Sequence, residues 1–281
     1  MLDIKNMFCD PADGVAAPGK LELLLPSDGY GLNAMVLNAV GEGPRPLVIM
    51  LHGFPGNERN LDLAESLRAA GCHVLFFHYK GAWGSPGFFT FEDVLRDADN
   101  AVDFFRQPEI AAQYGVDPDL IFLVGHSMGG FAAIATLAKR DDLRGAVAMA
   151  PYDFAASRAA AEFSPEYAAN YEAVVRCPLP PLRLQCEDVL HDELTCHMQD
   201  WLLPDKAPEL AGKQLCIFAF DRDVVSPAPL HLAPLVEAFA PAMGDGLTVS
   251  HFDTDHGYNS RRYAVAKAAA EWIESRCGVR V

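Results

Sequence analysis

The chain has 281 residues, of which 51% are hydrophobic and 21% charged, and its formal net charge is -16 at pH 7. This apolar content is near the norm of globular proteins and is ample for a sizeable core. The negative charge opposes nucleic acid and anionic membrane surfaces as partners.

The cysteines and the N-terminal segment favour a soluble protein without a disulfide framework. The seven cysteines are odd in number, their spacing is irregular and no CxxC occurs. The first residues, MLDIKNMFCDPADG, show no basic segment followed by an apolar stretch, so we expect no signal peptide. The longest apolar runs, such as 47–51 and 74–77, are far too short to span a bilayer. We expect a cytoplasmic protein with no membrane span. Its oligomeric state stays open, and a homodimer is one possibility.

Eight short apolar segments predict β-strands. The first two, 21–25 and 32–39, are separated by the turn-rich residues 26–31. Most of the others are continuous apolar runs, which is typical of strands that a parallel sheet buries on both faces. These are 47–51, 74–79, 120–124, 146–150, 215–220 and 248–252.

Three apolar repeats at helical spacing predict helices among these strands. Thr90 and Asp93 form a capping box before the second helix. The third helix, over about residues 260–276, is expected to bury Tyr263. The apolar positions are Leu63, Leu67 and Ala70, then Val94, Ala98, Val102 and Phe105, then Tyr263, Ala266, Ala270 and Ile273. The alternation of strand and helix predicts an α/β fold, with helices on both faces of a mostly parallel central sheet.

Residues 152–213 break this alternation, because they are too long for an ordinary connection between two buried strands. They are rich in Ala, Glu and Pro. We interpret them as a mostly helical insertion that forms a cap over one end of the sheet. The core then consists of residues 1–151 and 214–281.

Residues 120–130, LIFLVGHSMGG, contain the pattern G-x-S-x-G with Gly125, Ser127 and Gly129. The pattern follows a buried strand and opens a helix of small residues, which is the context of a nucleophile elbow. Ser127 must adopt strained backbone angles to present its hydroxyl above the sheet. Side chains two residues before and after it would collide with neighbouring backbone, and glycine removes that collision. The helix that follows would point its positive end at a developing oxyanion.

With this elbow the sequence resembles the α/β-hydrolase superfamily, and the resemblance covers nearly the whole chain. LVIMLHGFPGN (47–57) is similar to the family's oxyanion loop, and VLFFHYKGAWGSPG (74–87) to the strand and loop that follow. DRDVVSP (221–227) and DHGY (255–258) resemble the loops of the catalytic acid and histidine. The combined pattern is closest to small esterases and to the hydrolase domains of prolyl-oligopeptidase-like enzymes.

A serine hydroxyl needs a base, and the base needs an orienting carboxylate. The family order along the chain is Ser, acid, His, which implies His256, in the loop after the last strand, as the base. The family's D-x-V-x-P spacing favours Asp223 as the acid, with Asp221 as the alternative. Phe220 stands where the family usually has a glycine, three residues before the acid.

The resemblance further implies an oxyanion hole made of two backbone N–H groups, from Met128 and from Phe54 in the loop after Gly53. It implies no cofactor, and the remaining histidines and cysteines lack zinc-ligand spacing, so we expect no metal.

The implied function is a serine hydrolase that acts on a small-molecule acyl substrate, a carboxylic ester or related bond, through an acyl-enzyme. Two alternatives stay open: an aminopeptidase or acyl-peptide hydrolase-like peptidase, and a catalytically inactive binding module. Four aromatic side chains are candidates for the substrate pocket and equally for the core: Trp83, Phe88, Phe89 and Trp201.

Overall fold

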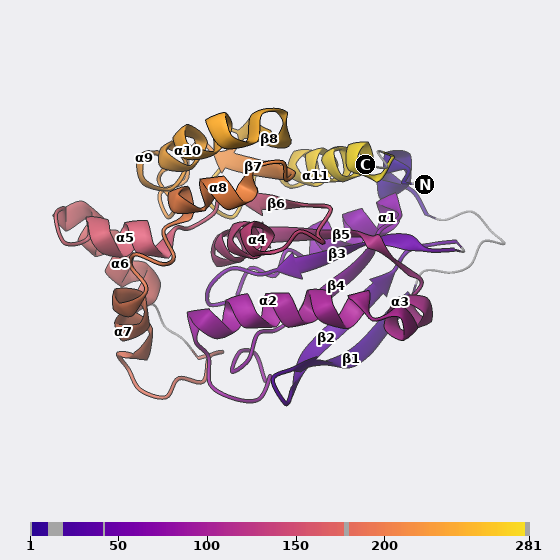
Figure 1. Ribbon diagram of the computed structural model, residues 1–281, viewed down its shortest axis with the longest axis horizontal. Helices are drawn as coiled ribbons and strands as arrows, with labels where there is room; N and C mark the ends of the chain where they lie inside the picture. Colours follow the sequence, from indigo (N-terminus) through magenta and orange to yellow (C-terminus); the bar gives the residue numbers. More distant parts are fainter. Residues whose placement is uncertain (1, 11–18, 42, 177–179, 279–281) are drawn as a thin grey trace.

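A computed structural model of the protein describes residues 2–10, 19–41, 43–176 and 180–278. Its centre is an eight-stranded sheet with the order β1-β2-β4-β3-β5-β6-β7-β8 (Figure 1). β1 pairs antiparallel with β2 and β2 with β4, whereas the other neighbours are parallel. The mostly parallel sheet is therefore confirmed. The strands are β1 Gly19–Ser27, β2 Tyr30–Asn38, β3 Arg45–Leu51, β4 His73–Phe77, β5 Val116–His126, β6 Gly145–Met149, β7 Leu215–Phe220 and β8 Leu247–Phe252.

The first two strands form a tighter hairpin than the sequence predicts. They continue to Ser27 and resume at Tyr30, so only Asp28 and Gly29 lie between them. Both of these residues have positive φ, +44° and +80°. Such a two-residue turn matches the twist of the paired strands, and the Asp-Gly pair adopts it readily.

Helices cover both faces of the sheet, as predicted. On one face α1 Leu61–Ala70 packs against α11 Arg262–Cys277 and against the short helix η1 Ile4–Phe8. On the other face α2 Phe91–Arg106 packs against α4 Met128–Lys139 and against α3 Pro108–Tyr114.

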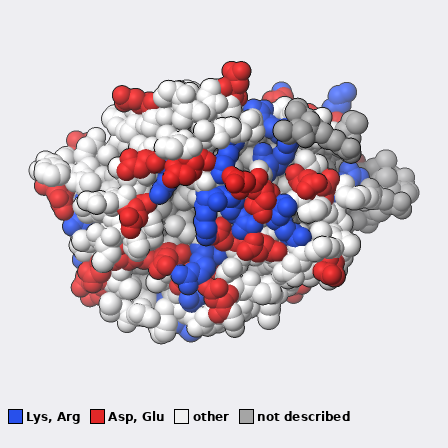
Figure 2. Space-filling model, in the orientation of Figure 1, with Lys and Arg blue, Asp and Glu red and all other residues white. Residues whose placement is uncertain are grey.

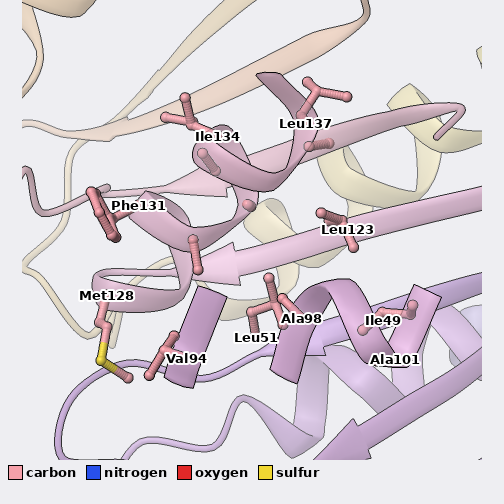
Figure 3. Close-up of a cluster of buried hydrophobic side chains, with 14 of the residues drawn as sticks. Ile49, Leu51, Val94, Ala98, Ala101, Leu123, Met128, Phe131, Ile134 and Leu137 are labelled. Carbon is pink, nitrogen blue, oxygen red and sulfur yellow. The ribbon is translucent and has the colours of Figure 1, made fainter. Parts of the chain in front are cut away.

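Each face has its own apolar cluster. In the cluster beneath α2 and α4, Val94 and Ala98 meet Leu51 and Leu123 of the sheet, and Phe131 lies on α4 beside them (Figure 3). This packing fixes α4, and with it the turn at its N-terminus, against β3 and β5.

Two details of the helices test the sequence patterns. The Thr90 hydroxyl accepts the N–H of Asp93 at 3.0 Å, which is one half of the predicted capping box, whereas the Asp93 carboxylate bonds Lys80 instead. The prediction that Tyr263 lies in the core is wrong, because its side chain is 77% exposed. The other three predicted positions, Ala266, Ala270 and Ile273, are buried, and the buried face also includes Val265 and Ala269.

The segment 152–213 lies between β6 and β7. Its first helices stand away from the sheet, whereas η2 and α8 pack against α4 and α10 Ala233–Met243 (Figure 1). The described helices are α5 Phe154–Ala160, α6 Pro165–Val175, α7 Val189–Cys196, η2 Leu203–Lys206 and α8 Ala207–Leu210. The role of this segment as a cap stays a prediction.

Figure 2 shows Lys and Arg side chains interspersed with Asp and Glu on the face that α2 and α4 present. Arg140 forms ion pairs with Asp103 and Asp142 there, and Lys139 pairs with Asp99. The basic groups of this face are therefore balanced by carboxylates. The described helices are too short or too polar to cross a membrane.

Candidate active site

Ser127 lies at the sharp turn between β5 and α4, with φ +57° and ψ -116°. A Cβ atom added to Gly125 would lie 1.9 Å from the Gly129 carbonyl oxygen, and one added to Gly129 would lie 1.8 Å from the Leu51 carbonyl oxygen. Both contacts are with backbone, which cannot yield as a flexible side chain can. The steric reason for the two glycines is thus confirmed.

The backbone of Ser127 is tied to its surroundings on both sides. Its N–H donates to the Met149 carbonyl at 2.9 Å, and its carbonyl accepts the N–H groups of Phe131 and Tyr152. These bonds hold the strained residue between the end of β6 and the first turn of α4. The hydroxyl makes no hydrogen bond within the described ranges, and the residue is 8% exposed.

The structure brings His256 together with Asp223. The Nδ1 atom of His256 lies 2.6 Å from Oδ2 of Asp223. The other oxygen, Oδ1, accepts the backbone N–H groups of Val225 and Ser226, both at 2.8 Å. Three donors therefore converge on one buried carboxylate, and together they orient it.

The alternative carboxylate, Asp221, lies elsewhere. It bonds to Nδ1 of His251 at 2.8 Å, in an exposed position. Phe220, which replaces the family's glycine, still permits the turn, because its carbonyl accepts the Asp223 N–H at 3.1 Å. The geometry thus favours Asp223 over Asp221 as the partner of His256.

The pKa of Asp223 lies below its ordinary value. Burial alone would raise this pKa, but the hydrogen bond and charge of His256 and the N–H groups of Ser226 and Val225 outweigh burial. The carboxylate is consequently ionised at neutral pH and can stabilise a positive charge on the His256 ring.

His126 connects the His256 loop to the nucleophile elbow. Its Nε2 lies 2.8 Å from the His256 carbonyl oxygen, and the two rings are 4.8 Å apart at their centroids. Because a carbonyl only accepts, Nε2 of His126 carries the proton. Burial, followed by the charge of His256, lowers the pKa of His126 to about 3, so the ring is neutral. This contact brings the predicted base beside the residue that precedes Ser127.

The loop after β3 lies against the elbow. A Cβ atom on Gly53 would come within 3.2 Å of the Ser127 Cβ. The next residue, Phe54, packs its ring against Phe91, with centroids 5.3 Å apart. Met128 is the first residue of α4, where a backbone N–H has no partner within the helix. The N–H groups of Phe54 and Met128 as an oxyanion hole stay a prediction.

The aromatic candidates for a pocket divide between core and surface. Phe89 is fully buried and Trp201 is 9% exposed, and both belong to the core cluster. Phe88 is 43% exposed. Trp83 is half-buried, and the Arg59 guanidinium lies 4.0 Å above its ring.

Three residues near the acid loop were given no role from the sequence. Asn170 of α6 donates to the carbonyls of Val224 and Val225, at 3.0 and 3.2 Å. Tyr152 donates its hydroxyl hydrogen to the Asn170 side chain at 3.3 Å. His231 stacks on Tyr152 with centroids 4.4 Å apart. They belong to no motif, and no spacing signal in the sequence could have identified them.

No group of three or more His, Cys, Asp or Glu side chains suited to a metal ion occurs among the described residues.

A family model described as the alpha/beta hydrolase family matches residues 48–279. The chain belongs to the alpha/beta hydrolase family. It is 28% identical over 130 residues to the uncharacterized protein Rv2307c of Mycobacterium tuberculosis, a match that covers 46% of the chain and 44% of that relative. The match thus spans less than half of the relative's length.

Two solved structures show the same fold. The esterase Pf2001 of Pyrococcus furiosus superposes with a TM-score of 0.66 and 16% identity, over 92% of this chain and 91% of that one. The acylaminoacyl peptidase of Pyrococcus horikoshii gives 0.66 and 14%, over 93% of this chain and 42% of the peptidase. At these identities the likeness concerns the fold alone.

Proposed function

We propose that this α/β hydrolase is a serine hydrolase that cleaves a carboxylic ester through an acyl-enzyme, with Ser127 as nucleophile, His256 as base and Asp223 as acid. The observation that carries the proposal is the Asp223–His256 hydrogen bond, 2.6 Å long, held beside a strained serine turn. The resemblance of its sequence motifs to those of small esterases supports an ester as the bond that is cleaved.

In the first step His256 accepts the Ser127 proton while the hydroxyl oxygen attacks the ester carbonyl. The Asp223 carboxylate accepts a hydrogen bond from Nδ1–H, which leaves Nε2 unprotonated and able to take the Ser127 proton, and it stabilises the imidazolium that forms. The oxyanion of the tetrahedral intermediate accepts the N–H groups of Phe54 and Met128. His256 then gives its proton to the leaving alcohol. Water, activated by the same base, releases the acid product.

We further propose that residues 152–213 act as a cap that defines the substrate pocket. The support is the contact of α6 with the acid loop, where Asn170 bonds two consecutive carbonyls beside Asp223. A small-molecule substrate fits this arrangement. The peptidase and the inactive binding module are the outcomes against which the proposal is tested.

The first test is covalent labelling with a fluorophosphonate, followed by mass spectrometry of the labelled peptide. We expect the label on Ser127, and we expect Ser127→Ala to lose the label and several powers of ten in turnover. Ser66→Ala is the matched control, because that hydroxyl only bonds the Asp62 carbonyl on α1. A wild-type protein that remains unlabelled would support the inactive module instead.

The second test compares p-nitrophenyl esters of increasing acyl length with aminoacyl anilides. We expect turnover of the esters and little of the anilides. The opposite preference would establish the peptidase alternative.

A further inference from the structure

His231, the last residue of α9 Ala228–His231, is a buried histidine without a role in the proposed reaction. It is 1% exposed. Its Nδ1 accepts the backbone N–H of Asp153 at 3.0 Å. A backbone N–H can only donate, so Nδ1 carries no hydrogen, and the neutral ring carries its hydrogen on Nε2. Burial lowers the pKa of His231 to about 3, which keeps the ring neutral. The tautomer is therefore fixed: Nε2 is a donor.

This donor has no hydrogen-bond partner among the described residues, although the atom is buried. Buried N–H groups in proteins are almost always paired, with protein or with ordered water. His231 lines a small cavity of about 20 Å³ together with Asp223 and Ser226. A cavity needs only about 10–15 Å³ to hold one water molecule, provided that polar groups surround it. The volume and the lining both suit a single water.

The polar groups around the cavity complement such a water. Oδ1 and Oδ2 of Asp223 accept three hydrogen bonds from protein donors, and an ionised carboxylate offers about four lone-pair sites, so it can accept another. The Ser226 hydroxyl donates to the Ala150 carbonyl at 3.3 Å, which leaves its oxygen as an acceptor. A water that accepts from His231 could therefore donate to both Asp223 and Ser226.

We propose that His231 is a positioning residue for the catalytic acid: its Nε2–H binds one water in this cavity, and that water donates a hydrogen bond to the Asp223 carboxylate. The inference rests on the proposed function, since it gives His231 a part in orienting the acid of that reaction. The stacking of the His231 ring on Tyr152, with 29° between the planes, holds the donor in place. The other titratable residues near this ring are Asp153, whose backbone N–H it accepts, and His256.

Two variants of His231 separate positioning from mere packing. In His231→Asn the side-chain oxygen can replace Nδ1 as the acceptor for Asp153, but the Nε2 donor is lost. In His231→Gln the amide nitrogen reaches the place of Nε2 and can still donate. Urea unfolding of both variants sets conditions in which each is folded. The rate of fluorophosphonate labelling at Ser127 is then measured from pH 5 to 9, so no knowledge of the natural substrate is needed.

We expect His231→Asn to slow labelling about tenfold, as for the loss of one hydrogen bond to a charged group, and His231→Gln to stay within about threefold of wild type. Removal of a donor beside the Asp223 carboxylate should also change the pH dependence of labelling, because the electrostatic surroundings of the acid change. Equal slowing of both variants with an unchanged profile would show a structural role and overturn the proposal.

A high-resolution crystal structure gives a readout that does not depend on activity. We expect a water at hydrogen-bond distance from both His231 Nε2 and Asp223. A dry cavity, or a direct bond from Nε2 to another group, would overturn the proposal. If the wild-type protein is not labelled at all, the proposed function fails by itself, whereas the crystal structure still decides the hydrogen bonding of His231.

Discussion

Substitution of Asp223 by Asn tests the acid of the proposed triad with the smallest change of shape. The amide has nearly the volume of the carboxylate, so the acid loop should keep its fold. The negative charge disappears, and the amide N–H₂ can face Nδ1 of His256 and hold the ring in the wrong tautomer. Both effects weaken His256 as a base for Ser127.

The size of the charge effect follows from the structure. Nδ1 of His256 and Oδ2 of Asp223 are 2.6 Å apart, which places the charge centres of ring and carboxylate about 4 Å apart. Two opposite charges at about 4 Å attract by about 4 kcal/mol at an effective dielectric constant of about 20. The acid side chain is only 2% exposed and the histidine 19%, so solvent screens this attraction little. Loss of about 4 kcal/mol from the transition state slows the reaction about 10³-fold, and the wrong tautomer would add to this.

The assay is the second-order rate of fluorophosphonate labelling, supported by turnover of a short p-nitrophenyl ester. Asp221→Asn is the matched control, because Asp221 lies two residues before Asp223 and bonds the exposed His251 instead of His256. We expect the control to keep its rate within about twofold, as for surface positions in general. A rate of Asp223→Asn within tenfold of wild type, or equal losses in the two variants, would refute the assignment of the acid.

Three further predictions concern the elbow, the cap and a buried carboxyl. Gly129→Ala should abolish soluble expression or labelling, because the added Cβ would lie 1.8 Å from a backbone oxygen. Gly278 has open space around it, so Gly278→Ala should behave as wild type on a soluble-expression gel. Asn170→Ala should lower the free energy of unfolding by about 1 kcal/mol in urea titrations and slow labelling several-fold, because two hydrogen bonds to the acid loop are lost; an unchanged labelling rate would disprove this coupling. Burial raises the pKa of Asp97 from its ordinary 3.8 to about 6. The Asp97 carboxyl therefore stays protonated to higher pH in the native state than in the unfolded chain, and the stability that Asp97 contributes falls as pH rises from about 4 to 6. Asp97→Asn does not titrate and should gain up to about 3 kcal/mol on wild type between pH 4 and 7 in urea unfolding; a constant difference would contradict the raised pKa.

The sheet could be predicted from the sequence because its strands are short, apolar and bounded by turn residues. β7 was predicted to the residue, as Leu215–Phe220. The sequence placed the end of β1 too early and the beginning of β2 too late. Pro26 and Ser27 look like turn residues, but they pair across the hairpin with Gly31 and Tyr30. The backbone pairing overrode the local preference of these residues.

The last helix shows a second limit. The pattern predicted that Tyr263 faces the core, and the spacing to Ala266 and Ala270 is indeed helical. The side chain is nevertheless exposed, because it lies near the beginning of α11, where the helix presents Val265 and Ala266 to the sheet instead. Periodicity identifies the helix and its buried face, since Ala266, Ala270 and Ile273 are buried as predicted, but it does not settle at which turn of the helix the burial begins.

The candidate site likewise contains residues that the sequence identifies and residues that it does not. Its motif residues are recognisable because steric requirements force the residue types: only glycine fits beside the backbone at positions 125 and 129. Tyr152, Asn170 and His231 have no such requirement. Tyr152 and Asn170 reach the acid loop through the path of the segment 152–213, whereas His231 lies on α9, which follows that loop. Any residue able to make the same contacts would serve.

The acid loop is the point where these two kinds of residue meet, and this has a physical consequence. Backbone N–H groups from within the loop fix one oxygen of Asp223, while Asn170 holds the loop's carbonyls from α6 and Tyr152 connects Asn170 to the backbone of Ser127. A displacement of α6 must therefore either break these hydrogen bonds or move the acid loop. In the proposed enzyme, where His256 is the base and residues 152–213 form the cap, the orientation of His256 depends on Asp223. Substrate contacts with that cap would then be transmitted to the base without any direct contact between them.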